Sequence, residues 1–329
     1  MGTTLERQVL ATQSWTSRMI KVVRYNPEHR RTWDDFISNS KNGVFLFYRN
    51  YMEYHSDRFR DHSLLFFTDE KPIALMPANA RDNNLYSHEG LTFGGIISGY
   101  DMKTPLMMEI FEELVEYLKG ENIKRIVYKA IPHIYHAVPA EEDLYVLFRY
   151  NAKLVRRDVT SSIYLPAKPK FQENKVRTIK RALKNRIFVK KSDDFSTYMR
   201  IVKQVLMERH GVRPVHSCEE IAMLAARFPD NIKLFASYRG DTMLAGVIIY
   251  ESTNVAHAQY IANSPEGMRL GALDIVFDYL INEYYNEKRY FDFGISTENE
   301  GRFLNNGLIN YKEDFGARAI AHDFYEVSI

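Results

Sequence analysis

Hydrophobic positions in the second half of the chain change their spacing in an order that predicts a particular series of elements. Three apolar runs, the first two separated by the turn residues 239–241, predict a β-hairpin and a further strand at residues 232–238, 243–250 and 255–262. Apolar residues at three- and four-residue steps then predict a helix over residues 270–284. A final run predicts a strand at 290–295, after which the apolar periodicity ends.

The first half of the chain repeats this order of patterns. It opens with a strand and two helices, continues with a hairpin and ends with an amphipathic helix and a strand, at residues 20–25, 27–38, 47–56, 64–67, 73–78, 107–118 and 123–130. The repetition predicts two copies of one α/β plan, each a mixed, largely antiparallel sheet flanked by helices. The alternative is a pair of unrelated α/β domains, because this order of elements recurs among folds.

A pair of prolines marks the boundary that we expect between the two units. Pro166 and Pro169 interrupt a strand ending at Leu165, and a basic amphipathic helix is predicted over residues 172–186. We therefore expect an N-terminal domain at 19–165 and a C-terminal domain at 166–329 that begins with this helix. Residues 1–18 are polar and unpatterned, which favours a disordered extension. A single apolar stripe is expected to anchor the basic helix, formed by Val176, Ile179, Leu183 and Ile187.

Composition narrows the class of protein. The 329 residues are 45% hydrophobic and 13% aromatic, which suffices for large cores and excludes a disordered chain. The net charge of +2 gives no reason to expect DNA as a partner. Cys218 is the single cysteine, which fits a reducing compartment, and no apolar run approaches the ~20 residues of a membrane-spanning helix. We expect a cytoplasmic protein without a membrane span.

Two segments are candidate anion sites. In the basic helix, Arg177, Arg181 and their lysine neighbours lie on adjoining turns, where guanidinium groups grip phosphate oxygens or simply face solvent. Residues 264–271 join a predicted strand to a predicted helix, and Arg269 and Gly271 stand where backbone N–H groups at a helix N-terminus attract an anion. The alternative for this second segment is an ordinary strand-to-helix turn.

Polar residues on predicted strands and turns supply the candidate chemistry. His257 and Gln259 share one face of a likely central strand next to Tyr260, so His257 is either a general base or a hydrogen-bonded core residue. His88 and Glu89 precede a glycine cluster that suggests close approach to a ligand. His216 lies between two helices and forms either a gate or a tight connection.

Several other motifs lack the residues that their chemistry requires. His133 and His136 have no third metal ligand nearby, and a zinc site needs at least three protein ligands, so we expect no metal. The kinase-like sequence Asp292-Phe293-Gly294 has neither a glycine-rich phosphate loop nor a catalytic loop to accompany it. No Gly-x-Ser-x-Gly elbow is present, which excludes a hydrolase of the usual α/β type.

Two sequence segments resemble one known family. Residues 290–296, 306–308 and 311–317 are similar to the C-terminal signature of Fem-type transferases, with Tyr311 replacing the usual Phe of a Phe-Lys-x-x-Phe-Gly motif. Residues 175–184 are similar to the Arg-x-x-Ile-Arg-Lys-Ala-x-Lys helix at the junction between the family's domains. The resemblance is specific in the second half and at the junction, and it is only architectural in residues 20–165.

The resemblance implies two tandem GNAT-like (acyl-CoA N-acyltransferase) domains and an acyltransferase that uses no metal. An activated acyl donor and an amine acceptor would meet in a cleft between two similar sheets lying side by side, with Lys312 projecting into that cleft. Lys312 and His257 are then the expected catalytic residues. Expected donor contacts are Arg269, Gly271, Gln259 and Tyr260, and expected acceptor contacts are His88, Glu89, Arg177, Arg181 and His216.

The identity of the two substrates stays open at the level of sequence. The chain lacks the helical arm of family members that act on cell-wall precursors with aminoacyl-tRNA, which favours acyl-CoA or a similar thioester as donor. The expected acceptor is a small-molecule or nucleotide-linked amine, such as an amino sugar or a cell-surface precursor in envelope or polysaccharide biosynthesis. The alternatives are an aminoacyl-tRNA-dependent peptidyltransferase, with tRNA as partner, and a degenerate GNAT pair that only binds ligands.

Overall fold

A computed structural model describes residues 19–329, apart from the side chains of Arg209 and His210. The extension predicted for residues 1–18 lies outside the described residues. The N-terminal half contains a four-stranded sheet with the order β1-β2-β3-β6, formed by Ile20–Arg24, Leu64–Thr68, Lys71–Met76 and Ile97–Ser98. Its α-helices are α1, α2, α3 and α4, at Arg30–Ser38, Arg49–Met52, Thr104–Gly120 and Glu142–Arg149.

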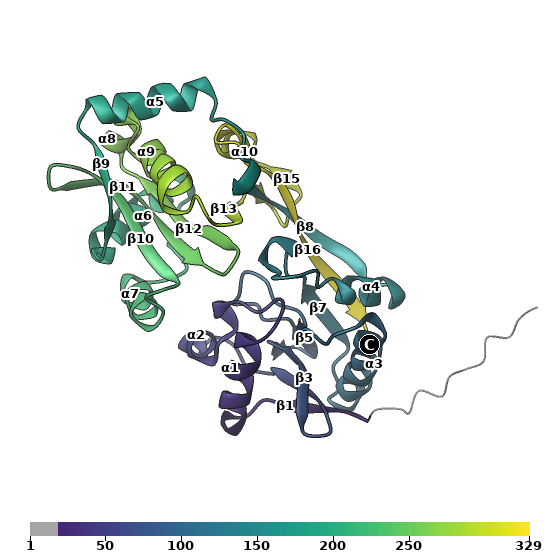
Figure 1. The fold of residues 1–329 in the computed structure, drawn as a ribbon. Coiled ribbons are helices and arrows are strands. Elements are labelled where there is room, and N and C mark those ends of the chain that lie inside the picture. The colour runs from purple at the N-terminus through teal and green to yellow at the C-terminus, as the bar shows by residue number, and fades with distance from the viewer. Residues whose placement is uncertain (1–18) are drawn as a thin grey trace, which may run out of the picture.

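A second sheet of ten strands runs through both halves of the molecule (Figure 1). Its order is β4-β5-β7-β16-β8-β13-β12-β11-β10-β9. The strands of the N-terminal half are β4, β5, β7 and β8, at Asn79–Arg81, Asn84–Tyr86, Arg125–Lys129 and Lys153–Tyr164. The later strands are β9, β10, β11, β12, β13 and β16, at Phe188–Ser192, Ile232–Arg239, Thr242–Glu251, Val255–Asn263, Tyr290–Ile295 and Arg318–Ser328. A separate small hairpin pairs β14 and β15, at Thr297–Glu298 and Phe303–Leu304.

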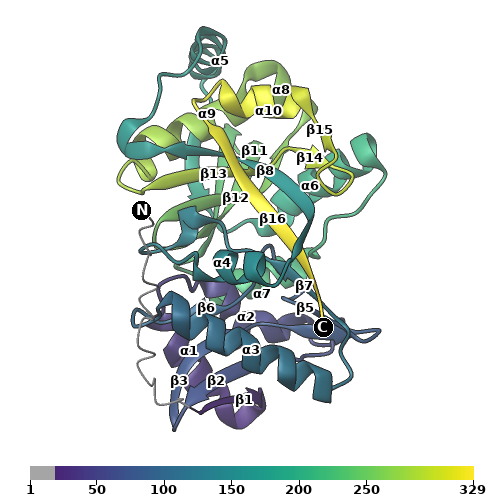
Figure 2. The ribbon, with the colours of Figure 1, turned by 90° about the vertical axis from the view of Figure 1, so that its right-hand side faces the viewer.

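The expectation of two separate sheets was wrong, and the long strands β8 and β16 are the reason. They pair with each other over residues 153–162 and 318–326. β8 also pairs with β13 of the C-terminal half, and β16 pairs with β7 of the N-terminal half. Figure 2 shows β16 crossing the molecule from the C-terminal half to the N-terminal half. Backbone hydrogen bonds therefore run without a break from one half to the other.

The helices of the C-terminal half are α5, α6, α7, α8, α9 and α10, at Glu173–Lys184, Phe195–His210, Cys218–Arg227, Pro265–Leu270, Ala272–Tyr279 and Asn306–Glu313. The helix predicted over residues 270–284 is divided at Gly271, whose φ of +80° belongs to the left-handed region. A π-helical turn at Leu280–Tyr284 continues α9. The hairpins and the helices predicted at 27–38, 107–118 and 172–186 lie close to where the periodicity placed them. The helix predicted at 47–56 was wrong in length, because only Arg49–Met52 is α-helical and 3-10 turns flank it on both sides.

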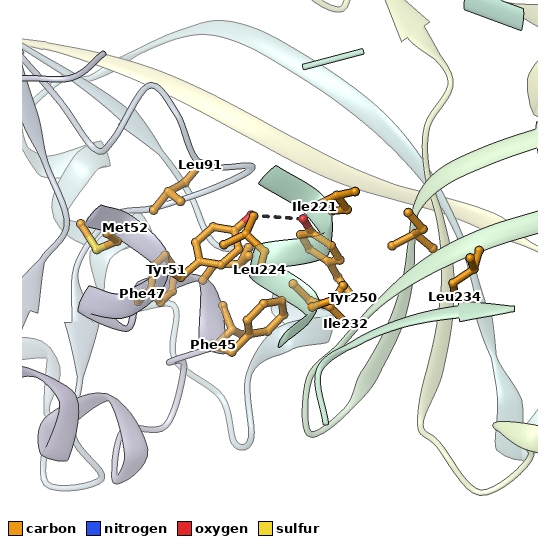
Figure 3. Packing of buried hydrophobic residues seen from close by; sticks show 14 of the residues in the cluster. Phe45, Phe47, Tyr51, Met52, Leu91, Ile221, Leu224, Ile232, Leu234 and Tyr250 are labelled. Atoms are coloured by element: carbon orange, nitrogen blue, oxygen red, sulfur yellow. Dashed lines mark hydrogen bonds between the residues drawn. The ribbon is translucent and has the colours of Figure 1, made fainter. Parts of the chain in front are cut away.

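One hydrophobic core joins the two halves. Phe45 and Tyr51 of the N-terminal half pack against Ile221, Leu224 and Tyr250 of the C-terminal half (Figure 3). The rings of Phe45 and Tyr250 lie 5.4 Å apart, and the Tyr51 hydroxyl donates a hydrogen bond to the Tyr250 hydroxyl at 3.4 Å. This shared core fixes the two halves against each other on one side of the cavity described next.

Candidate active site

A cavity of about 960 Å³ lies between the two halves of the protein. Its walls come from the loop after β5 and from β7 in the N-terminal half, from α6, β12, β13 and α10 in the C-terminal half, and from β8 and β16, which join them. The cavity is thus lined by both copies of the α/β plan and by the strands that connect them.

The strands β12 and β13 separate at this cavity. They are parallel neighbours but pair over three residues only, 255–257 with 290–292. Just beyond this point the register between β11 and β12 shifts, so that Ile248 faces Tyr260, Ile249 faces Ala258, and Gln259 has no partner residue. A bulge of this kind breaks the ladder and re-aims side chains. Residues 257–261 and 292–295 line the cavity on the two sides of the gap.

His257 and Asp292 form a hydrogen-bonded pair at the point where these strands separate. The Nδ1 atom of His257 lies 2.7 Å from an Asp292 carboxylate oxygen, and the other oxygen accepts a hydrogen bond from the Thr160 hydroxyl at 2.5 Å. Burial raises the pKa of Asp292, but the hydrogen bonds from His257, Thr160 and the Gly294 backbone outweigh burial and leave the pKa below its usual value. Asp292 is therefore a buried carboxylate that fixes the orientation of an imidazole on the cavity wall.

Lys312 reaches the same cavity from α10. Its ammonium group donates hydrogen bonds to the carbonyl oxygens of Gly294 at 2.8 Å and Ile295 at 2.7 Å, and only 2% of the residue is exposed. Burial lowers the pKa of Lys312 to about 8, although the negative charge of Asp292 acts in the opposite direction. Lys312 belongs to the lining of the cavity, with its ammonium group directed at these two carbonyl oxygens, and its catalytic role remains a prediction.

The N-terminal half contributes a second lysine, which is half-buried, to the cavity wall. The ammonium group of Lys129 donates to three carbonyl oxygens, those of His88, Glu89 and Leu91, at 2.8 to 3.0 Å. Burial lowers its pKa to about 8. Nearby, burial lowers the pKa of His322 to about 4, and its Nε2 atom is buried without a hydrogen-bond partner among the described residues. A neutral imidazole with an unused nitrogen thus lies in this wall.

The cavity brings together five of the residues that the sequence singled out. Two come from the expected catalytic pair, two from the expected donor contacts and one from the expected acceptor contacts: Lys312, His257, Gln259, Tyr260 and Glu89. The Oε1 atom of Gln259 is buried and has no hydrogen-bond partner among the described residues. The assigned roles of these five residues remain predictions.

Other predicted site residues lie outside the cavity lining. His88 has a left-handed backbone with φ of +63°, and its ring stacks on His55 at 5.1 Å. His216 hydrogen-bonds Tyr54 of the N-terminal half at 2.9 Å and Tyr260 of β12 at 2.7 Å, so it bridges the halves beside the cavity. Arg177 and Arg181 are exposed on α5, which contributes no residue to the cavity.

The segment expected to hold the donor's phosphates forms a packed junction. Arg269 is exposed at the end of α8, and a Cβ atom built on Gly271 would lie 2.8 Å from the Thr178 carbonyl oxygen of α5. Gly271 therefore permits the close packing of α5 against this turn. Neither Arg269 nor Gly271 lines the cavity, and their role as donor contacts remains a prediction.

The pair partner of His257 was not among the predicted site residues. Asp292 was noted within a kinase-like tripeptide and within the Fem-type segment 290–296 but was given no role, although a polar residue in the middle of the apolar strand 290–295 is a usable signal. The same signal applies to Lys129 at the end of the apolar strand 125–129. Thr160 and His322 carry no such signal, because their positions in the cavity depend on the pairing of β8 and β16.

No helix among residues 19–329 is long and apolar enough to cross a membrane. Within the same residues, no three His, Cys, Asp or Glu side chains gather in a way that would hold a metal ion.

Comparisons with known proteins extend these observations. Residues 170–313 match the family model described as an acetyltransferase (GNAT) domain. A comparison with curated protein sequences gives no match. Similarity to solved structures is stronger in shape than in sequence, as three of them illustrate.

FemX aligns over 94% of this chain and 97% of its own, with 11% identity and a TM-score of 0.66. L-PGS from Bacillus licheniformis aligns over 92% of both chains, with 12% identity and a TM-score of 0.59. A tandem GNAT protein from the clavulanic acid biosynthesis pathway aligns over 94% of this chain and 98% of its own, with 8% identity and a TM-score of 0.50. The chain therefore has the fold of FemX and of this tandem GNAT protein, and its residues 170–313 match the model of an acetyltransferase (GNAT) domain.

Proposed function

We propose that this protein is an N-acyltransferase that moves an acyl group from an activated donor to an amine in the cavity between its halves. The observation that carries the proposal is the His257–Asp292 pair, which lies on the cavity wall at the gap between β12 and β13, with Lys312 in the same wall. An oriented imidazole and a buried ammonium group match the needs of acyl transfer to an amine. The match of residues 170–313 to a GNAT domain supports the same reaction class.

The reaction follows from these positions. The acceptor nitrogen attacks the acyl carbonyl carbon, the new C–N bond forms, and the bond from that carbon to the donor's leaving group breaks. The Nε2 atom of His257 takes the proton that the amine loses, and Asp292, held by Thr160, stabilises the imidazolium that results. The proton then passes to the leaving group or to solvent.

The carbonyl oxygen becomes negatively charged as the amine attacks. The bulge at Gln259 frees backbone N–H groups of β12 from the ladder on the cavity wall, and such donors contribute about 3 kcal/mol each to the stability of the transition state. The ammonium group of Lys312 counters the same charge, provided that it carries its proton. A donor in the gap between β12 and β13 would therefore present its carbonyl to groups that are already in place.

The two walls of the cavity suggest where each substrate lies. We assign the gap beside Gln259 and Tyr260 to the donor and the opposite wall, with Glu89, to the acceptor. The donor is an acyl-CoA or a similar thioester, and the turn at Gly271 that is predicted to hold its phosphates packs against α5 outside the cavity lining. The acceptor is an amine such as an amino sugar or a cell-surface precursor. The Fem-type resemblance also admits aminoacyl-tRNA as donor.

A product assay tests the proposal. The protein is incubated with acetyl-CoA, longer acyl-CoAs or charged tRNA and with free or nucleotide-linked amino sugars, and mass spectrometry detects the amide product. We expect His257→Gln to lower kcat by 10²-fold or more. His133→Gln is the matched control, because His133 is exposed and does not line the cavity.

Full activity of His257→Gln would remove this residue as the base. The absence of product from every donor, together with no shift in Tm, would favour a protein that does not catalyse acyl transfer. Product from charged tRNA but from no thioester would assign the peptidyltransferase alternative.

A further inference from the structure

One end of the C-terminal half carries a concentration of unpaired positive charge. Between Arg177 and Lys191 the sequence contains no Asp or Glu, although the whole chain is nearly neutral. The basic residues of this segment are all exposed, and none forms a salt bridge with a described residue. We call them the basic end: Arg177, Lys180, Arg181, Lys184, Arg186, Lys190 and Lys191. By contrast, Arg58, Arg81 and Arg157 elsewhere on the surface each pair with a carboxylate.

Apolar side chains lie exposed among these charges. Of the four residues expected to anchor α5 by a single stripe, Ile179 and Ile187 are buried, whereas Val176 is 38% exposed and Leu183 is 58% exposed. Val176 and Leu183 are two turns apart on one side of the helix, with Lys180 between them. Phe188, at the start of β9, is 46% exposed. Part of the predicted stripe therefore remains uncovered in this chain.

The position of α5 allows a flat partner to reach this surface. The buried side of the helix is held to the domain by Lys175, whose ammonium group lies 3.5 Å from the centre of the Tyr311 ring and 3.7 Å from Asp274. Figures 1 and 2 show α5 lying across one extremity of the molecule. The basic end lies outside the cavity lining, so a partner bound there leaves that lining uncovered.

We propose that the basic end binds the surface of an anionic phospholipid bilayer. Clustered Lys and Arg side chains are attracted to a negatively charged leaflet, and neighbouring apolar side chains enter the region between headgroups and acyl chains. Val176, Leu183 and Phe188 decide between a bilayer and a nucleic acid. The exposed apolar residues of α5 are aliphatic, so they gain nothing from phosphates and offer no ring on which a base could stack. One face of the Phe188 ring already lies against Tyr238 at 5.9 Å.

Vesicle sedimentation tests the proposal on the full chain. We expect binding to vesicles of phosphatidylglycerol and phosphatidylcholine, no binding to phosphatidylcholine alone, and weaker binding as salt increases. The triple variant Lys180→Gln, Arg181→Gln, Lys184→Gln should bind about 100-fold more weakly, because each cation near the surface contributes about fivefold. The matched control is Lys103→Gln, Lys124→Gln, Lys153→Gln, which removes three exposed lysines of the N-terminal half that form no salt bridge with a described residue.

Leu183→Asn separates a bilayer from a nucleic acid as the partner. The substitution keeps every charge, so a weakening of vesicle binding by several-fold at unchanged Tm supports the proposal. Equal binding to neutral vesicles, no binding to anionic vesicles, or equal losses in the two triple variants would overturn it. The proposal would also fall if transfer RNA bound more tightly than vesicles and Leu183→Asn had no effect on either. These measurements use no acyl donor, so they stand or fall independently of the proposed reaction.

Discussion

Three charged side chains that line the cavity are held in place by hydrogen bonds. Lys312 and Lys129 each satisfy their ammonium groups with backbone carbonyl oxygens, and Asp292 satisfies its carboxylate with His257 and Thr160. Hydrogen bonds offset the cost of burying such groups, but burial still shifts the pKa values of both lysines to about 8. The protonation state of the cavity is therefore sensitive to mild alkali.

The pH dependence of Lys312 gives the first prediction at this scale. The lysine carries its charge below a pKa of about 8, so acyl transfer that needs the charge should fall as pH rises through about 8. Lys312→Arg should shift this loss to higher pH if it retains activity, since a guanidinium does not titrate there. Lys312→Met should lower kcat by 10- to 1,000-fold at pH 7. The measurement is kcat against pH for all three proteins, and an unchanged alkaline limb in Lys312→Arg would contradict the role.

The same shift has a consequence for stability, with a definite sign. The pKa of Lys312 is about 8 in the folded protein and 10.5 in its reference state, so between these values the unfolded chain binds more protons than the folded one. Stability contributed by this group therefore increases from pH 8 to pH 10.5 and is lost as pH falls through 8. Urea titrations of the wild type and Lys312→Met at pH 7.5 and 9.5 measure the free energy of unfolding, which should rise less between these pH values in the variant. Equal increases would show that Lys312 does not titrate in this range.

The carboxylate of Asp292 gives a further prediction. Asp292→Asn retains the shape of the side chain but removes the charge that orients and stabilises the His257 imidazolium. We expect kcat to fall by about 10²- to 10⁴-fold with a smaller change in KM. Steady-state kinetics measures the effect, and far-ultraviolet circular dichroism verifies that the variant is folded. Wild-type kcat in Asp292→Asn would show that the pair is structural.

Single elements show how backbone geometry overrides periodicity. The apolar stripe over residues 270–284 is continuous, yet the helix breaks at Gly271, where the backbone is left-handed and α5 lies too close for a side chain. The stripe of α5 is likewise incomplete in the structure, with Val176 and Leu183 exposed. In both cases a neighbouring element, which periodicity does not contain, determines which positions are covered.

A pair of glycine substitutions isolates this packing effect. Gly240 and Gly271 both have left-handed backbones, but a Cβ atom on Gly240 meets no atom within 4 Å, whereas one on Gly271 meets the Thr178 carbonyl. Gly240→Ala should cost about 1 kcal/mol from conformation alone. Gly271→Ala should cost about 2–4 kcal/mol, because overpacking against α5 adds to that cost. Equal urea midpoints for the two variants would mean that α5 yields without penalty.

The whole molecule is joined by two independent connections. One is the ten-stranded sheet, continuous through β8 and β16, and the other is the core in which Phe45 of the N-terminal half packs on Tyr250 of the C-terminal half. Both connections border the cavity, which is lined by Phe93, Tyr135 and Thr160 between them. The relative placement of the catalytic candidates therefore depends on contacts between halves.

Removing one side chain of the shared core should affect the stability of both halves. Phe45→Ala is expected to lower the free energy of unfolding by about 3–5 kcal/mol while retaining a single transition, as for a fully packed aromatic residue. Phe148→Ala is the control, because Phe148 is 76% exposed and should change stability by less than about 0.5 kcal/mol. Urea unfolding followed by both fluorescence and circular dichroism measures the transitions. Two separate transitions in the wild type would show that the halves unfold independently.

The sequence by itself determined the local elements and some of the candidate residues of the site. Apolar spacing predicted the hairpins, the helix at α3 and the order of strands, because side chains alternate along strands and recur at three to four residues along helices. The Fem-type motifs predicted the tandem GNAT fold, and strand alternation together with the motif around Lys312 identified His257, Gln259 and Lys312 as candidates.

Only the tertiary structure decided how distant segments combine. The pairing of His257 with Asp292 and Thr160 joins three strands, and the positions of Lys129 and His322 depend on β16 crossing to the N-terminal half. Covering of the Gly271 turn by Thr178 also joins elements that are far apart along the chain. Such contacts depend on which strands and helices become neighbours, and local periodicity carries no information about that choice.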